Sequence, residues 1–211
     1  MRNAIFFDLD GTLTDPKTGI TRCIRHAMER LNVAAPAEDE LTWCIGPPLR
    51  PSLVKLVGEA AADQALMHYR ERFSAVGLYE NDLYPGVPEL LENLRDRQLF
   101  LATNKPAVFA RRILEHFGIV GFFEGILGPE LNTITVSKSD LIGQALVQNR
   151  LKPADAAMVG DRTDDIVAAR QNNMIGLGVA YGYGGEAELR TAGAAAVFAT
   201  VEDLRRGLLD I

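Results

Sequence analysis

The chain has 211 residues and a formal net charge of −6, with 22 Lys and Arg residues against 28 Asp and Glu residues. Hydrophobic residues make up 47% and charged residues 24%, which is ordinary globular composition, and the length allows one domain with an insertion or two small ones. The isoelectric point of about 5.1 argues against a general nucleic-acid-binding protein, whose surface would be basic. Two cysteines, Cys23 and Cys44, are too few for a disulfide framework and indicate a reducing compartment.

The apolar segments of the chain are short. Ala4–Phe7 and Ala194–Ala199 fall far short of the roughly 20 residues that a membrane-spanning helix needs. Asp8 follows too early for the apolar region of a signal peptide. We therefore expect a cytoplasmic protein, a monomer or homodimer, with neither a membrane nor a nucleic acid polymer as its partner.

Short apolar runs alternate with helical patterns along most of the chain. The run within residues 2–9 predicts a strand buried on both faces. Further strands are predicted at Leu99–Thr103, Phe122–Leu127, Ala156–Val159, Ile175–Val179 and Ala195–Phe198. Helices are predicted at Val87–Arg97, Pro106–Phe117, Ser139–Arg150, Asp164–Gln171, Glu186–Ala192 and Val201–Leu209. This alternation predicts an α/β fold, with a Rossmann-like parallel sheet core and helices on both faces.

Residues 17–82 break the alternation. Apolar residues recur there at helical spacing, first at Ile20, Cys23, Ile24, Ala27, Met28 and Leu31. Further helices are expected at Leu41–Cys44, Pro51–Val57 and Ala60–Val76. We therefore predict a core domain of residues 1–16 and 83–211 with a helical cap domain at 17–82, joined by hinge-like segments.

The strongest local signal is Asp8-Leu9-Asp10-Gly11-Thr12, directly after the first predicted strand. Asp8 and Asp10 project from the same face of an extended chain, at the strand end where parallel sheets usually bind ligands. Two carboxylates this close repel each other, and a hard divalent cation relieves the repulsion. Gly11 permits a turn that other residues disfavour, and Thr12 offers a hydroxyl and an amide to an anion. The alternative is a solvated acidic turn, against which the apolar run before Asp8 argues.

Three other binding motifs fail on spacing or context. An EF-hand loop beginning at Asp8 would place Leu13 where glycine is needed and Gly19 where the bidentate glutamate is needed. No Gly-x-x-x-x-Gly-Lys-Ser/Thr loop occurs in the sequence. Residues 182–187 match the dinucleotide fingerprint formally, but too few residues follow for a second nucleotide-binding half.

Two later segments offer groups for an anion. Thr103-Asn104-Lys105-Pro106 follows a predicted strand, and its hydroxyl, side-chain amide and backbone amides at a helix start suit an anion. The same residues also form common turns. Lys138 precedes a helix and can bring a point charge to a phosphate, although a surface lysine would look the same.

A second acidic cluster, Gly160-Asp161-Arg162-Thr163-Asp164-Asp165, follows the strand predicted at 156–159. Its carboxylates would join those of the first strand if both strands lie in one parallel sheet. The structural alternative is helix capping by Asp161 or Thr163, with acids in the first turn.

Together these residues resemble the motifs of the haloacid dehalogenase superfamily, in order and in spacing, over nearly the whole chain. The four motifs correspond to Asp8-x-Asp10-Gly11-Thr12, Thr103, Lys138 and Gly160-Asp161-x-x-x-Asp165. The helical insertion resembles the C1-type cap of this superfamily. Four further segments, Tyr69–Phe73, Gly77–Asn81, Tyr84–Val87 and Gly178–Gly184, resemble its phosphoglycolate phosphatase-like branch, whose members are named phosphoglycolate phosphatase or 5′-nucleotidase.

The resemblance implies a Mg²⁺-dependent phosphatase that hydrolyses small phosphate monoesters. Asp8 would attack phosphorus to form an aspartyl phosphate, and Asp10 would act as general acid and base. Mg²⁺ would be held by Asp8, the Asp10 backbone carbonyl and Asp161, with Asp165 supporting the site. The remaining implied site residues are the catalytic Thr103 and Lys138, and the substrate-binding Leu9, Thr12 and Asn104.

Two positions complicate this assignment. Lys105 competes with Lys138 for the phosphate, but we expect it to point away because it stands beside Asn104. Asn132-Thr133 stands where close relatives often carry Asp-Gly before the lysine, so the turn there can differ in shape.

Three alternatives to a phosphatase are a dehalogenase, a sugar-phosphate mutase and a protein that only binds its ligand. The dehalogenases of the superfamily lack the second acid, so Asp10 favours phosphoryl transfer over halide displacement. A sugar-phosphate mutase would keep both acids and a similar cap. A role in binding alone would require a defect among the catalytic residues, and none is visible. Among phosphatase substrates, 2-phosphoglycolate leads narrowly over nucleoside 5′-monophosphates.

Substrate specificity is expected to lie in the helical insertion, because the phosphate site is common to all these substrates. The candidate contacts are Thr21, Arg22, Trp43, Gly46 and Arg50. Arg50 could bind a substrate carboxylate bidentately, and the alternative is a solvated arginine at a helix start. Opening of this insertion as a lid could limit turnover.

Overall fold

The computed structural model describes residues 3–131 and 136–210. The chain divides into two compact units, one of Met1–Thr14 with Leu83–Ile211 and one of Asp15–Asp82. The smaller unit is thus an insertion between the first strand of the larger unit and all its later elements. The boundaries predicted from the sequence, 16/17 and 82/83, lie within two residues of these.

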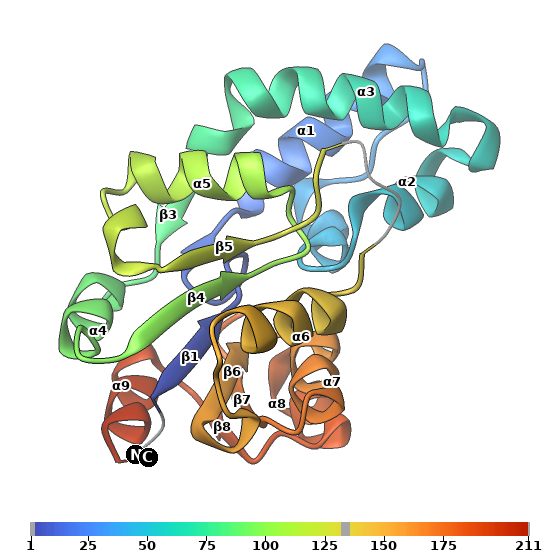
Figure 1. Ribbon diagram of the computed structural model, residues 1–211. Helices are drawn as coiled ribbons and strands as arrows, with labels where there is room; N and C mark the ends of the chain where they lie inside the picture. Colours follow the sequence, from blue (N-terminus) through green and yellow to red (C-terminus); the bar gives the residue numbers. More distant parts are fainter. Residues whose placement is uncertain (1–2, 132–135, 211) are drawn as a thin grey trace. The chain divides into compact units, whose positions relative to one another are not determined.

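A six-stranded sheet forms the centre of the larger unit (Figure 1). Its strands are β1 (Ala4–Phe7), β4 (Gln98–Ala102), β5 (Gly125–Leu127), β6 (Ala156–Gly160), β7 (Ile175–Val179) and β8 (Ala196–Phe198). They lie in the order β5-β4-β1-β6-β7-β8, and each neighbouring pair is parallel. From β1 the chain passes through β4 to β5, and then returns to β6 on the other side of β1. Ligands bind α/β sheets at such a reversal of strand order, and the predicted α/β fold is confirmed.

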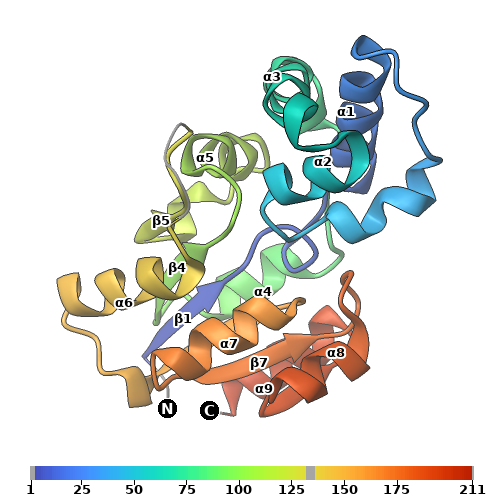
Figure 2. The ribbon, with the colours of Figure 1, turned by 90° about the vertical axis from the view of Figure 1, so that its right-hand side faces the viewer.

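Helices cover both faces of this sheet. They are α4 (Val87–Asn93), α5 (Ala107–His116), α6 (Lys138–Gln148), α7 (Thr163–Gln171), α8 (Gly185–Ala192) and α9 (Val201–Leu209), with 3₁₀ turns at Val120–Phe122 and Pro153–Asp155. On one face, α6 and α7 pack against Phe6 and Phe100, whose rings stack with centroids 4.9 Å apart. Helices α4 and α9 pack together on the other face (Figure 2). All four residues of β1 are buried, as expected for a strand covered on both sides.

The smaller unit is helical. It contains α1 (Lys17–Arg30), α2 (Leu49–Val57) and α3 (Glu59–Ala75), with 3₁₀ helices at Glu38–Cys44 and Gly77–Tyr79. The apolar residues of α1 are buried at the spacing noted in the sequence, and α1 packs against α3. Arg72 of α3 binds Glu80 at 2.7 Å and donates to the Cys23 sulfur of α1 at 3.2 Å.

Two short strands join the units. These are β2 (Thr14–Asp15) and β3 (Asp82–Leu83), which form a two-stranded sheet. The sequence predicts hinge-like segments here, and it does not predict the two strands. Among the described residues, no helix combines the length and the apolarity needed to cross a bilayer.

Candidate active site

Polar side chains of the larger unit gather where three neighbouring strands end. Asp8 follows β1, Thr103 follows β4 and Asp161 follows β6. The Asp8 amide donates to the Val159 carbonyl at 2.9 Å, which continues the pairing of β1 with β6. The parallel sheet therefore brings residues that are distant in sequence to one edge, at the reversal of strand order.

The turn after β1 is tightly closed. The Leu9 carbonyl accepts hydrogen bonds from the amides of Thr12, Leu13 and Thr14, at 3.2, 2.9 and 3.0 Å. Gly11 has a φ of +84°, and a Cβ there would lie 2.2 Å from a carboxylate oxygen of Asp161. The Leu9 side chain is buried in the core, so a substrate contact by Leu9 would involve its backbone. The Thr12 hydroxyl is buried without a hydrogen-bond partner among the described residues.

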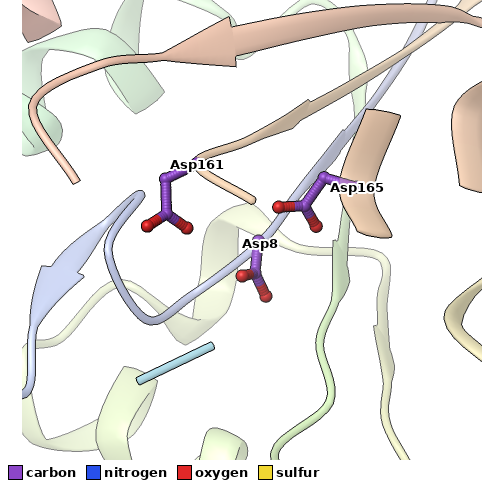
Figure 3. A group of neighbouring side chains, drawn as sticks. All are labelled: Asp8, Asp161 and Asp165. Atoms are coloured by element: carbon purple, nitrogen blue, oxygen red, sulfur yellow. The ribbon is translucent and has the colours of Figure 1, made fainter. Parts of the chain in front are cut away.

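Three buried carboxylates face one another beside this turn (Figure 3). Asp8, Asp161 and Asp165 each offer one oxygen, and these atoms lie within 4.8 Å of one another. The Asp161 Oδ1 atom is buried and has no hydrogen-bond partner among the described residues. A group of hard oxygen donors with such an unpaired buried atom fits a divalent cation.

The burial of these acids has an electrostatic cost. Burial raises the pKa of Asp161 to about 7, and the charge of Asp8 adds to this rise. Burial likewise raises the pKa of Asp8, although the Lys138 ammonium opposes the change. Both shifts disfavour the charged forms, and a bound cation would reverse that preference.

Lys138 supplies a buried positive charge to the cluster. Its Nζ contacts the Asp165 carboxylate, and lies 3.3 Å from Asp8 Oδ1 and 3.4 Å from Asp164 Oδ2. Burial alone would lower the pKa of Lys138, but the three carboxylates outweigh it and raise this pKa above its usual range. Lys138 is therefore an ammonium within the site, not a surface lysine.

Thr103 and Asn104 lie beside the same cluster. The Thr103 amide donates to the Leu127 carbonyl at 2.9 Å, which holds the end of β4 against β5. Asn104 Nδ2 donates to Asp164 Oδ2 at 2.7 Å. Asp164 was not among the predicted site residues, although its place beside Asp165 in the acidic motif was a usable signal. It connects Asn104 with the Lys138 ammonium.

Lys105 points into the site, and the prediction that it would point away is wrong. Its Nζ donates to Asp10 Oδ1 at 2.7 Å. The reason lies in the turn after β4, where the Lys105 amide donates to the Thr103 hydroxyl at 3.2 Å. The Lys105 carbonyl packs so close to Gly128 that a Cβ there would lie 2.6 Å away. This turn directs the Lys105 side chain back toward the loop after β1.

The loop between β7 and α8 supports both the acid cluster and the β1 turn. The Tyr183 amide donates to Asp161 Oδ2 at 2.7 Å, and the Tyr181 hydroxyl donates to the Thr12 carbonyl at 3.0 Å. A Cβ at Gly182 would lie 2.3 Å from the Gly11 carbonyl oxygen. The residues that match a dinucleotide fingerprint thus pack against carboxylates. Sequence reasoning had given this loop no role in the site.

The residues expected to contact the substrate from the insertion lie in the helical unit. The Arg50 guanidinium binds Asp63 and Glu59, both at 2.7 Å, in α3 of its own unit. Four further candidates have partners or a turn within this unit: Thr21 with the Lys17 carbonyl, Arg22 with Glu38 and Glu80, Trp43 beneath Lys55, and Gly46 with a φ of +99°. Asn132-Thr133 lies outside the described residues.

Comparison with known proteins identifies the family. The sequence model of haloacid dehalogenase-like hydrolases matches residues 5–179, which include Asp8, Thr103, Lys138 and the acids at 161 and 165. The chain belongs to this family.

Named relatives and a solved structure agree with this membership. A 5′-nucleotidase of Pseudomonas aeruginosa is 46% identical over 190 residues, covering 88% of this chain and 86% of the relative. Tyrosine-protein kinase PtkA of Mycobacterium tuberculosis is 37% identical over 208 residues, covering 97% of this chain and 72% of the relative. A phosphoglycolate phosphatase of Colwellia psychrerythraea is 27% identical over 215 residues, covering 96% of this chain and 95% of the relative. The crystal structure of a predicted phosphatase from Clostridium acetobutylicum, 37% identical, superimposes with a TM-score of 0.94 and covers 100% of both chains. The chain is a phosphoric monoester hydrolase.

Proposed function

We propose that this hydrolase uses Mg²⁺ and an aspartyl-phosphate intermediate to hydrolyse small phosphate monoesters. The observation that supports this most strongly is the buried group of Asp8, Asp161 and Asp165 with the Lys138 ammonium at its side. A nucleophilic carboxylate next to a fixed positive charge suits attack on a phosphate, because the anion must be held while it is attacked.

Asp8, Asp161 and the backbone carbonyl of Asp10 are the proposed holders of Mg²⁺. Bound there, Mg²⁺ would offset the repulsion between the carboxylates and the negatively charged phosphate. Asp165 has a supporting role in this proposal, because its carboxylate already binds Lys138 and accepts from the Arg162 amide at 3.0 Å. Support of this kind orients the groups that bind a metal.

The proposed reaction has two steps. Asp8 attacks phosphorus while the bond to the leaving alcohol breaks, and Asp10 donates a proton to the leaving oxygen. Asp10 then takes a proton from the water that cleaves the aspartyl phosphate. Lys138 and Thr103 bind the phosphoryl oxygens. Asn104 and the Thr12 hydroxyl, which has no hydrogen-bond partner within the described part of the chain, are further donors.

Nucleoside 5′-monophosphates are the substrate class that we propose first, with 2-phosphoglycolate second. The 5′-nucleotidase of P. aeruginosa is 46% identical to this chain, against 27% for the phosphoglycolate phosphatase of C. psychrerythraea. This reverses the narrow order favoured by the sequence motifs. Arg50 remains a candidate for recognition of a substrate carboxylate, a role in which it would exchange Asp63 and Glu59 for the ligand.

The test is the release of inorganic phosphate with Mg²⁺ from nucleoside 5′-monophosphates, 2-phosphoglycolate and ATP. Asp8→Asn is the matched blank, because it keeps the size of the side chain and removes the nucleophile. We expect turnover of one monoester class that falls by at least about 10³-fold in Asp8→Asn. Absence of Asp8-dependent release from every monoester would refute the proposal.

The same assay separates two other reactions. A sugar-phosphate mutase would release little phosphate when primed with a sugar bisphosphate. A protein kinase activity, as in the name of the M. tuberculosis relative, would move the γ-phosphate of ATP to tyrosine and not to water. We expect monoester hydrolysis to be faster than both the mutase reaction and the transfer of phosphate to tyrosine.

A further inference from the structure

Two buried lysines divide the acids of the site between them. Lys138 contacts Asp8, Asp164 and Asp165, whereas Lys105 binds Asp10 at 2.7 Å. The side chains of Lys105 and Asp10 are 6% and 8% exposed, so this ion pair is nearly removed from water. Lys138 has the phosphoryl-binding role proposed above, whereas no role in the reaction has yet been proposed for Lys105.

The Lys105–Asp10 pair joins two hydrogen-bonded turns. Asp10 belongs to the turn closed by the Leu9 carbonyl, and Lys105 to the turn closed by the Thr103 hydroxyl. A buried ion pair is a costly way to fill space, since apolar side chains of similar volume often stabilise a fold as well or better. Its presence at a strand end, on the second acid of the site, is better explained by control of that carboxylate.

We infer that Lys105 is the positioning residue of Asp10. Its ammonium holds Oδ1 and fixes the plane of the carboxyl group, so that Oδ2 is the oxygen that exchanges the proton. In the first step this proton passes from Oδ2 to the ester oxygen as that oxygen leaves phosphorus. In the second step a proton of the attacking water returns to Oδ2. This inference rests on the proposed hydrolysis and adds to it a role for Lys105, which acts on the Asp10 carboxyl group.

A positioning role for Lys105 predicts a dependence on the leaving group. A nucleoside 5′-alkoxide needs a proton to depart, whereas 4-nitrophenolate departs as an anion. We expect Lys105→Met to lower kcat/KM for the nucleoside monophosphate by about 10²-fold or more, the usual contribution of a general acid. For 4-nitrophenyl phosphate the loss should stay within about threefold. Lys105→Arg, which keeps a charge at this place, should restore part of the lost rate.

Two comparison variants complete the experiment. Lys138→Met should slow both substrates to a similar extent, because a group that binds the phosphoryl oxygens serves both. In an Asp10→Asn background, adding Lys105→Met should cause no further loss, since Lys105 acts through Asp10. Thermal melting of each variant with Mg²⁺ establishes that folded proteins are compared.

The outcomes separate this inference from the proposed function. If the wild-type protein hydrolyses neither substrate, the hydrolysis proposal fails and the positioning role fails with it. If the wild-type protein is active and Lys105→Met slows both substrates equally, the positioning role alone is refuted. A further loss in the Asp10→Asn background would also refute it, because Lys105 would then act on another group.

Discussion

The Asp161 carboxylate combines an electrostatic cost to the fold with a proposed role in binding Mg²⁺. It is fully buried, and its pKa is raised to about 7 by burial and by the charge of Asp8. In an unfolded chain the pKa of the same group would lie near its ordinary value of 3.8. Between these values the folded state holds a proton that the unfolded state has released, so the contribution of Asp161 to stability falls as the pH rises from about 4 to about 7.

Asp161→Asn should therefore stabilise the metal-free protein at alkaline pH. The shift corresponds to at most about 4 kcal/mol, so we expect a melting temperature several degrees above wild type at pH 8 in EDTA, with the difference shrinking toward pH 5. Added Mg²⁺ should raise the melting temperature of the wild type and raise that of Asp161→Asn much less. Differential scanning calorimetry at the two pH values measures both effects.

The exposed Asp96 provides a matched control. Asp96→Asn makes the same chemical change at a solvated position, where it should leave the effect of Mg²⁺ on the melting temperature unchanged. Equal melting temperatures of Asp161→Asn and wild type at pH 8 without metal would mean that burial of the Asp161 charge costs the fold nothing.

At the scale of elements, the β7–α8 loop supports the site. Its packing at Gly182 allows this support to be tested. A Cβ at Gly182 would lie 2.3 Å from the Gly11 carbonyl oxygen and 2.5 Å from the Asp161 Cβ, so Gly182→Ala must displace the β1 turn, the acid or both. We expect a loss of Mg²⁺ affinity of about 10- to 100-fold, as for other groups that orient metal ligands. Isothermal titration calorimetry with Mg²⁺ measures this without any turnover.

Gly121→Ala is the control for this loop variant. Gly121 lies in the 3₁₀ turn at Val120–Phe122, and nothing lies within 4 Å of the position that its Cβ would occupy. It should bind Mg²⁺ with the affinity of the wild type. An unchanged affinity in Gly182→Ala as well would show that this loop does not support the metal ligands.

The strands of the main sheet could be predicted from the sequence, and the two short strands β2 and β3 could not. β1, β6 and β7 appear as short apolar runs because both faces of each strand are buried. β2 and β3 have two residues each and are defined by pairing with each other, a tertiary contact that leaves no periodicity in either segment.

The same distinction applies to the site. The meeting of Asp8 and Asp161 follows from the general rule that parallel strands end at one edge of a sheet. The direction of Lys105 depends instead on one turn, set by the Thr103 hydroxyl and the close approach of Gly128. No pattern in the sequence encodes the orientation of one side chain after a turn, so the partner of Asp10 was missed.

At the scale of the whole molecule, the two units differ in the chemistry that their residues offer. The carboxylates, both buried lysines and the supporting loop all belong to the larger unit, which contains the complete six-stranded sheet. The helical unit has its own buried residues, among them those between α1 and α3. The pairing of β2 with β3 brings the two ends of the insertion together, so a short turn can replace it.

A protein in which a glycine-containing turn replaces residues 16–81 should therefore fold and bind Mg²⁺. We expect a cooperative thermal transition and Mg²⁺ affinity within about threefold of the intact protein, because the acid cluster and its supports are all retained. We expect 4-nitrophenyl phosphate to be hydrolysed still, in an Asp8-dependent reaction. The ratio of kcat/KM between a nucleoside 5′-monophosphate and 2-phosphoglycolate should approach one, with at least about a tenfold loss of preference. The reason is that the residues proposed to distinguish these substrates are removed. If the shortened protein keeps the substrate preference of the intact chain, specificity resides in the larger unit, and Arg50 and its neighbours have no part in it.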